Sequence, residues 1–429
     1  MKIQSEFKRA TNLFQKGNFI EAKKIYEQIL VEKSDLPEIH CNLGIILKIL
    51  NNLEEAEKSF AKAISLKTDF VHAHYHMGNT KYKLKKFDES EYSYKKAISL
   101  NSKFIEAYIN LSRAQRELGR LSEAEENARV ALKLNPDLAD ANNQLSLILF
   151  DRGRLSDDLK NKDLEKLNEA KKIILKAIDL NPNYALSYLN YGLILQELGD
   201  FNGAKDALQK SLDIDPNSFL AKYNLDILIK QIDLLNKIGL ELNADNLIHS
   251  NFKKKFSKNP FITHRNPSKD LINLLYKINS TELNKTKGGP LYGNGKTSDY
   301  QIFDNDNPIL NDVKNDIIKI IKDEIKANVF IIDSFFNILG AGGGSVPHHH
   351  LNSIDKNFNL DQQKYSLTYY LDVGDQKCSE PGYFVMEDPE EKVLPTNGMI
   401  MVIPASRKHS AVYSGKSDRL MIGVNFYCY

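Results

Sequence analysis

The segment ATNLFQKGNFIEAKKIYEQIL, residues 10–30, sets the pattern of the first half of the chain. Small residues stand at Ala10, Gly17 and Ala22, and aromatic residues stand at Phe19 and Tyr26. The same classes return at a spacing of 34 residues, first as Gly44, Asn51, Leu53, Ala56 and Phe60, then as Gly78, Lys85, Phe87, Ser90 and Tyr94. A constant period of this length predicts stacked helical hairpins, because one hairpin cannot bury its apolar face alone.

Three further copies make six in all. They carry Ser112, Gly119 and Ala124; Ser146, Gly153 and Ala170; and Gly192, Gly199 and Ala204. The fifth copy takes an insertion of 12 residues near 155–168. Residues 217–240 have helical apolar spacing without the repeat pattern and are expected to cap the array. The prediction for residues 1–240 is therefore an all-α solenoid.

This pattern resembles the tetratricopeptide repeat (TPR) family over more than half of the chain. The resemblance implies a superhelix whose concave face docks a peptide or protein. The alternative is that the array serves only as a spacer or an oligomerisation element.

Composition places few limits on function. The net charge of +2 gives no reason to expect a nucleic-acid partner. Cys41, Cys378 and Cys428 are scattered without a CxxC spacing, which favours a reducing compartment over a disulfide framework. No signal-peptide core and no membrane-length apolar run is found, so a cytoplasmic protein without a membrane partner is expected.

The second half of the chain lacks the 34-residue period. A basic stretch broken by prolines predicts a linker at 241–265. Residues 268–280 and 308–327 have helical spacing, and short alternating runs follow: VFIIDSFFNIL, YSLTYYLDV, GYFVMED, GMIMVIP, SAVYS and RLMIGVNFY. Short strands divided by turn residues predict an antiparallel sandwich or barrel. A double-stranded β-helix (jelly roll) with flanking helices is the expected fold of residues 266–429.

The run VPHHHLNS, residues 346–353, carries the most unusual residues of this half. In an extended segment, alternate residues point to the same side, so His348 and His350 could hold one metal ion while His349 points away. His409, before a later strand, could supply a third ligand, and Arg419 follows it by ten residues. A guanidinium at that place could bind a carboxylate. Asp355 is the alternative to His350 as the middle ligand.

These motifs resemble the iron(II)/2-oxoglutarate-dependent dioxygenases, in particular a prolyl-hydroxylase-like branch. The resemblance implies an iron site of His348, His350 and His409. It also implies a co-substrate site of Arg419 and Tyr370, with Asn425 pointing into the barrel. The implied cofactors are Fe(II), 2-oxoglutarate and O2, with ascorbate as an optional reductant.

Three functions follow as expectations. The leading hypothesis is hydroxylation of a peptidyl or protein side chain that the repeats dock. The second is oxidation of a small molecule or glycan by the same chemistry, with the repeats mediating assembly only. The third is a non-catalytic TPR adaptor whose jelly roll binds a ligand without turnover.

Overall fold

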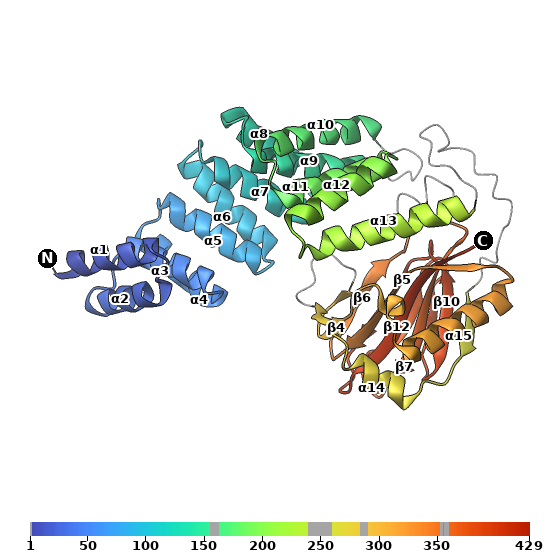
Figure 1. Ribbon diagram of the computed structural model, residues 1–429. Helices are drawn as coiled ribbons and strands as arrows, with labels where there is room; N and C mark the ends of the chain where they lie inside the picture. The colour runs from blue at the N-terminus through green and yellow to red at the C-terminus, as the bar shows by residue number, and fades with distance from the viewer. Residues whose placement is uncertain (1, 155–162, 239–259, 284–290, 352–354, 356–359) are drawn as a thin grey trace. The chain divides into compact units, whose positions relative to one another are not determined.

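The computed structural model describes residues 2–154, 163–238, 260–283, 291–351, 355 and 360–429 (Figure 1). The chain divides into two compact units, called here the first unit (Met1–Ile194) and the second unit (Leu195–Tyr429). No described helix has both the length and the apolar composition that crossing a membrane requires.

The first unit is a series of helical hairpins (Figure 1), as the repeat pattern predicts. Its helices are α1 (Lys2–Gln15), α2 (Phe19–Glu32), α3 (Pro37–Ile49), α4 (Leu53–Leu66), α5 (Val71–Lys83), α6 (Phe87–Leu100), α7 (Ile105–Glu117), α8 (Leu121–Leu134), α9 (Ala139–Arg154), α10 (Leu164–Leu180) and most of α11 (Ala185–Glu197).

The small and aromatic positions of the repeat pack against each other. A Cβ atom built on Gly44 would lie 2.7 Å from the ring of Phe60, and one built on Gly78 would lie 2.6 Å from the ring of Tyr94. In these two hairpins the helices can therefore approach closely only because the first helix lacks a side chain there. Gly17, with φ +80°, ends α1 in the left-handed conformation that glycine adopts without strain.

The structure describes only part of the predicted insertion near 155–168. Residues 155–162 lie outside the described residues, whereas residues 164–168 form the start of α10. Helices α9 and α10 contain 16 and 17 residues, compared with 13 and 14 in α7 and α8. Part of the insertion thus lengthens the fifth hairpin rather than forming a loop.

The second unit begins with helices that belong to the repeat region of the sequence. Helix α12 (Phe201–Ile214) is followed by α13 (Phe219–Lys237), which forms within the segment predicted to cap the array. The predicted boundary at residue 240 and most of the predicted linker at 241–265 lie outside the described residues, so this division stays a prediction. The end of that linker forms a strand, β1 (Phe261–His264), because it pairs with β10.

Two antiparallel sheets, with helices α14 (Lys269–Leu275) and α15 (Pro308–Ile325) and a 3-10 turn, η3 (Ile302–Asp304), follow in the second unit. The seven-stranded sheet has the order β1-β10-β7-β12-β5-β4-β2, and the five-stranded sheet has the order β3-β6-β11-β8-β9. The remaining strands are β2 (Thr281–Glu282), β3 (Leu291–Tyr292), β4 (Gly295–Thr297), β5 (Val329–Leu339), β6 (Gly343–His348), β7 (Lys364–Asp372), β8 (Pro381–Met386), β9 (Glu391–Val393), β10 (Met399–Pro404), β11 (His409–Tyr413) and β12 (Arg419–Cys428). Every strand predicted from the alternating runs is present.

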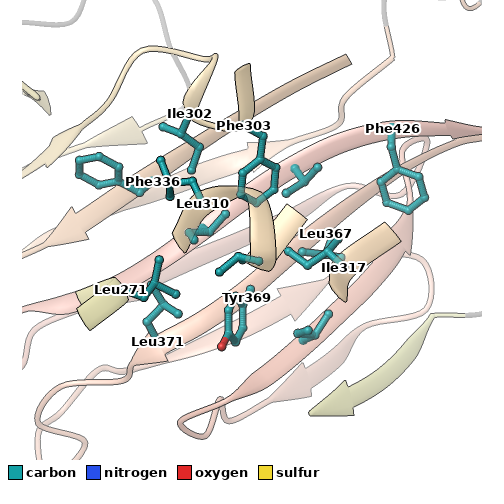
Figure 2. Packing of buried hydrophobic residues seen from close by; sticks show 14 of the residues in the cluster. Leu271, Ile302, Phe303, Leu310, Ile317, Phe336, Leu367, Tyr369, Leu371 and Phe426 are labelled. Carbon is teal, nitrogen blue, oxygen red and sulfur yellow. The ribbon is translucent and has the colours of Figure 1, made fainter. Parts of the chain in front are cut away.

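Two helices cover one face of the seven-stranded sheet. Helix α14 (Lys269–Leu275) contributes Leu271, and α15 (Pro308–Ile325) contributes Leu310 and Ile317 to a cluster with Phe336 and Leu367 of the strands (Figure 2). Side chains alternate along a strand, so the neighbours of these core residues point to the opposite face. That opposite face carries the site described below.

A second apolar cluster lies between the two sheets. It joins Tyr370 and Met421 of the seven-stranded sheet to Phe384, Met386 and Tyr413 of the five-stranded sheet. The predicted antiparallel architecture is therefore confirmed at the level of two packed sheets.

Candidate functional site

Three histidines at neighbouring ends of β6 and β11, two interior strands of the five-stranded sheet, form one cluster, called here the histidine triad. His409 begins β11 and lies opposite His348, the last residue of β6. His350 follows two residues later and donates its backbone N–H to the carbonyl of Ala405 at 2.9 Å. One ring nitrogen from each of the three lies within 4.8 Å of the others, so the triad could hold a metal ion. His349 is exposed and is not part of this group.

Burial keeps the triad uncharged near neutral pH. Desolvation lowers the pKa of His409 to about 4, and it lowers the pKa of His350 well below the usual value. The pKa of His348 is also lowered by burial, against a smaller opposing effect of its bond to the Val346 carbonyl. Neutral imidazoles carry the free lone pairs that metal coordination requires.

Hydrogen bonds select which nitrogen of each ring is free. The Nδ1 atom of His348 lies 2.9 Å from the carbonyl of Val346, and Nδ1 of His409 lies 3.3 Å from the carbonyl of Arg407. A proton held on Nδ1 leaves the Nε2 lone pair available, which is how ligating histidines are commonly oriented. His350 Nε2 and His409 Nε2 are 3.3 Å apart, near the roughly 3 Å expected of two neighbouring imidazole ligands on one metal.

Asp355 belongs to a different cluster. Its carboxylate is fully buried, accepts a hydrogen bond from Lys364 Nζ at 2.8 Å, and accepts another from the Tyr427 hydroxyl. Of the two candidates for the middle position, the structure therefore groups His350 with the other histidines. Asp355 instead neutralises the buried ammonium of Lys364.

A pocket of about 230 Å³ lies in front of the triad. Its floor is the face of the seven-stranded sheet that points away from α14 and α15, and its other walls include Ser345, Phe384 and Ala411 of the five-stranded sheet. Residues directly opposite on paired strands point to the same face, so the floor can be read as rows across β5, β12 and β7. The rows are Asn337, Met421 and Tyr370; Phe335, Gly423 and Thr368; and Asn425 and Ser366, with Asp333 opposite Asn425 but outside the pocket lining.

Arg419 lies beyond the first of these rows and is fully buried. Its guanidinium donates to the carbonyls of Val373 at 3.1 Å, of Gly382 at 2.6 Å and of Pro381. No carboxylate among the described residues forms an ion pair with it, and burial lowers its pKa. The pocket wall next to it is Tyr370, whose ring centre lies 5.9 Å from the guanidinium carbon.

Gly382 makes this burial possible. A Cβ atom on Gly382, which has φ +77°, would lie 2.0 Å from Nη1 of Arg419. The guanidinium therefore occupies the space that any side chain at this position would need. The sequence Pro381-Gly382-Tyr383, at the start of β8, therefore also provides the space in which the Arg419 guanidinium is buried.

Asn425 lies on the pocket floor, as the alternation of β12 implies. Its Nδ2 donates to Asp333 Oδ1 at 2.8 Å, while its Oδ1 is buried and has no partner among the described residues. The amide thus presents a hydrogen-bond acceptor toward the pocket. An acceptor suits a donor group on a ligand better than it suits the carboxylate of a co-substrate.

Three aromatic residues of the pocket carry no sequence signal. Tyr223 of α13, Tyr300 before η3 and Phe335 of β5 form a continuous wall, called here the aromatic wall, with ring centres 4.7 Å and 5.1 Å apart. Tyr223 stands in the capping helix, where an apolar periodicity explains an aromatic residue as packing. Asp333 lies in an apolar run of the sequence and was not predicted as a site residue. The signal that could have identified it is a single acidic residue within such a run.

Comparison with known proteins identifies the first half only. Family models described as tetratricopeptide repeat match residues 37–70, 71–104, 105–138 and 161–184 in one case and 173–206 in another. The N-terminal part therefore contains tetratricopeptide repeats. No curated protein matches the chain.

Solved structures give likenesses of the same kind. A structure from the characterisation of Pseudomonas aeruginosa PilF is 15% identical, with a TM-score of 0.43, and the match covers 51% of this chain and 95% of that one. YrrB, described as a TPR protein with an unusual peptide-binding site, is 21% identical with a TM-score of 0.36, covering 46% and 96%. TTC0263, a TPR protein of Thermus thermophilus, is 18% identical with a TM-score of 0.37, covering 45% and 99%.

Proposed function

We propose that the second unit is an iron(II)- and 2-oxoglutarate-dependent dioxygenase folded as a double-stranded β-helix. Its substrate would be a side chain of a peptide or protein, and the repeats would dock that partner. The observation that carries this proposal is the convergence of three neutral imidazoles on one point of a pocket wall. Two packed antiparallel sheets with the triad on the smaller one are consistent with the fold.

The donor set fits a divalent iron. His348, His350 and His409 would hold it through nitrogen atoms, and three protein ligands leave coordination positions for co-substrate and dioxygen. When bound, iron and 2-oxoglutarate supply the oxidation, in which dioxygen is consumed, succinate and carbon dioxide are released, and one oxygen atom enters the substrate as hydroxyl. Phe384, which stacks on His409 at 5.0 Å between ring centres, limits the access of water to that ligand.

Arg419 would receive the distal carboxylate of 2-oxoglutarate. A buried cation without an acidic partner is costly, and an anionic ligand would offset that cost. The guanidinium now donates to backbone carbonyls, so binding would exchange at least one of these bonds or use its remaining N–H groups. Tyr370 stands between Arg419 and the pocket, and its hydroxyl would be the first group to meet the carboxylate.

The role given to the repeats rests on their identity. Tetratricopeptide repeats present a concave helical surface, and such surfaces bind peptides or proteins. A docked partner would raise the local concentration of its own side chains at the pocket. The proposal therefore assigns binding to the first unit and chemistry to the second.

The test is an anaerobic titration of the full-length protein with Fe(II) and 2-oxoglutarate, followed by addition of oxygen. A weak visible absorption band should appear on addition of the second ligand, and succinate should be released with oxygen. His348→Ala and His409→Ala should each lower Fe(II) affinity by at least about 100-fold, because each removes a ligand.

His349→Ala is the matched control, since this neighbour stands outside the triad. Its Fe(II) affinity should stay close to that of the wild type. Wild-type protein that binds the metal but releases no succinate would refute the enzyme and favour a ligand-binding adaptor. Equal metal affinity in the wild type and His409→Ala would refute the metal site itself.

A further inference from the structure

A buried carboxylate without a countercharge lies next to Asn425, just beyond the residues that line one end of the pocket floor. Asp333 of β5 is 5% exposed, and no basic side chain among the described residues forms an ion pair with it. The two lysines whose positive charges lower the pKa of Asp333 have acidic partners of their own. Lys364 is 2.8 Å from Asp355, and Lys230 is 2.6 Å from Asp304. This end of the floor is therefore net negative when Asp333 is ionised.

Asn425 extends this negative character into the pocket. Its Nδ2 is held by Asp333 Oδ1, and turning the amide over would place two oxygen atoms against each other. The orientation of this pocket-lining amide is thus fixed, and its carbonyl Oδ1 is buried and unpartnered within the described part of the chain. A buried acceptor left without a donor destabilises the empty pocket, and a donating ligand would remove that cost.

The aromatic wall stands beside these two residues. Tyr223 and Tyr300 are half-buried, and their pKa values are raised first by desolvation and then by the negative charge of Asp333. Both rings therefore lie within electrostatic reach of the carboxylate. The faces of aromatic rings attract cations, and the attraction strengthens when water is excluded.

We propose that the end of the pocket lined by Asn425 and the aromatic wall, with the Asp333 carboxylate hydrogen-bonded to Asn425 beyond that lining, is a subsite for a cationic hydrogen-bond donor, the ammonium or guanidinium group of a basic side chain. The assignment of this group to a peptide rests on the proposed function. The subsite itself rests on the carboxylate, the oriented amide and the rings.

A neutral or anionic group would fit this place less well. A neutral donor could satisfy Asn425 but would leave the carboxylate without a countercharge, and an anion would be repelled by both oxygen-bearing groups. The opposite end of the floor has the reverse character, because Arg419 lies behind Tyr370 there. Substrate and co-substrate would thus enter the same pocket at ends of opposite charge.

Small probes test the subsite in the full-length protein. Nα-acetyl-lysine amide, Nα-acetyl-arginine amide and the neutral Nα-acetyl-norleucine amide are titrated at pH 8 by calorimetry, without added metal. At least one basic probe should bind tenfold or more tightly than the neutral probe, and the two basic probes distinguish ammonium from guanidinium. Asp333→Asn should remove this preference, since it keeps the hydrogen bond to Asn425 but not the charge.

Two further variants guard the result. Asn425→Leu removes the acceptor and should weaken binding of the preferred basic probe at least tenfold. Asn328→Ala, which changes an exposed asparagine just before β5 that does not line the pocket, should leave its affinity unchanged. Thermal melting of each variant shows that it is folded.

The proposal is overturned if the neutral probe binds as tightly as the basic ones, if no basic probe binds, or if folded Asp333→Asn keeps the preference. Succinate release in the same preparations, with Fe(II) and 2-oxoglutarate added, reports separately on the proposed function. Release without a basic preference removes the subsite alone. A basic preference without release supports the subsite and removes the dioxygenase.

Discussion

Arg419 and Asp333 are buried charges of opposite sign at the two ends of one sheet face, and they are accommodated differently. The guanidinium has three carbonyl acceptors and a glycine that leaves room for it. The carboxylate accepts from the side-chain amide and the backbone N–H of Asn425 and has no ion-pair partner among the described residues. Three carbonyl dipoles can hold a cation in place without a ligand, whereas the hydrogen bonds from one asparagine leave the acid without a countercharge. The charge at the Arg419 end of the pocket is therefore stabilised by the fold, whereas the charge at the Asp333 end lacks a countercharge in the absence of a ligand.

The largest effect is expected from Arg419→Met. This change leaves three buried carbonyls without their donor, at about 1–3 kcal/mol each, so the free energy of unfolding should fall by about 3 kcal/mol or more. Chemical denaturation measures the loss, and 2-oxoglutarate binding should be lost in the variant that remains folded.

Arg265→Met is the control for Arg419→Met. Arg265 is also partly buried, but it bonds to Asp316 and the Tyr369 hydroxyl on the side of the sheet away from the pocket. Arg265→Met should lower the free energy of unfolding by less than Arg419→Met does, and it should leave 2-oxoglutarate affinity unchanged. Equal losses from the two variants would mean that Arg419 is one structural arginine among others.

Asp333→Asn should act in the opposite direction. Burial raises the pKa of Asp333 from 3.8 to about 6, partly offset by Lys364. The folded state therefore holds this proton more tightly than the unfolded state, and stability falls as pH rises from about 4 to about 6. At pH 8 the ionised carboxylate costs about 3 kcal/mol, which the variant should regain in urea unfolding, while at pH 4 the two proteins should be alike.

The charged and titratable groups that act on or respond to Asp333 are Lys364 of β7, Tyr427 of β12, Tyr300, and Tyr223 and Lys230 of α13. Asp355→Asn is the contrasting variant, because it removes the partner of the buried Lys364 ammonium. It should lower stability by about 3 kcal/mol or more. If both substitutions destabilise the protein at pH 8, Asp333 is not an uncompensated charge.

The smallest effect is expected from Tyr223→Leu. Loss of one ring of the aromatic wall should weaken the basic probe by about 0.5–1 kcal/mol, a few-fold, and leave the neutral probe unchanged. Calorimetric titration measures both. Tyr276→Leu, a half-exposed tyrosine outside the pocket, should change neither affinity. An equal weakening of both probes by Tyr223→Leu would assign the ring to general packing.

The sequence predicted those features that depend on local periodicity. A fixed spacing brought Gly44 and Phe60 into one pattern, and the structure places them in contact. Strand alternation predicted that His348 and His350 share a side, and the spacing of the motifs added His409. The first two inferences need only neighbouring residues or a repeated distance, whereas His409 was added from its place before a later strand and ten residues ahead of Arg419.

Other features depend on contacts between distant segments. The acceptors of Arg419 come from Val373, Pro381 and Gly382, so neither its burial nor its hydrogen bonds can be read from the residues around it. The pairing of Asp333 with Asn425 requires the register of β5 and β12. A polar residue in an apolar run has no predicted partner until that register is known.

Helix α13 has a consequence for how such a protein can be rebuilt in evolution. By sequence it closes a repeat array, yet Asp226 meets Gln301, Lys230 meets Asp304 and Gln231 meets Tyr427, all within the second unit. A recombination event that exchanged the β-sheet region at residue 240 would leave these contacts behind, together with one ring of the pocket. The segment that must be inherited as a unit with the sheets therefore begins before Phe219. Proteins that exchange their repeat arrays in evolution are expected to keep helix α13 with the sheets.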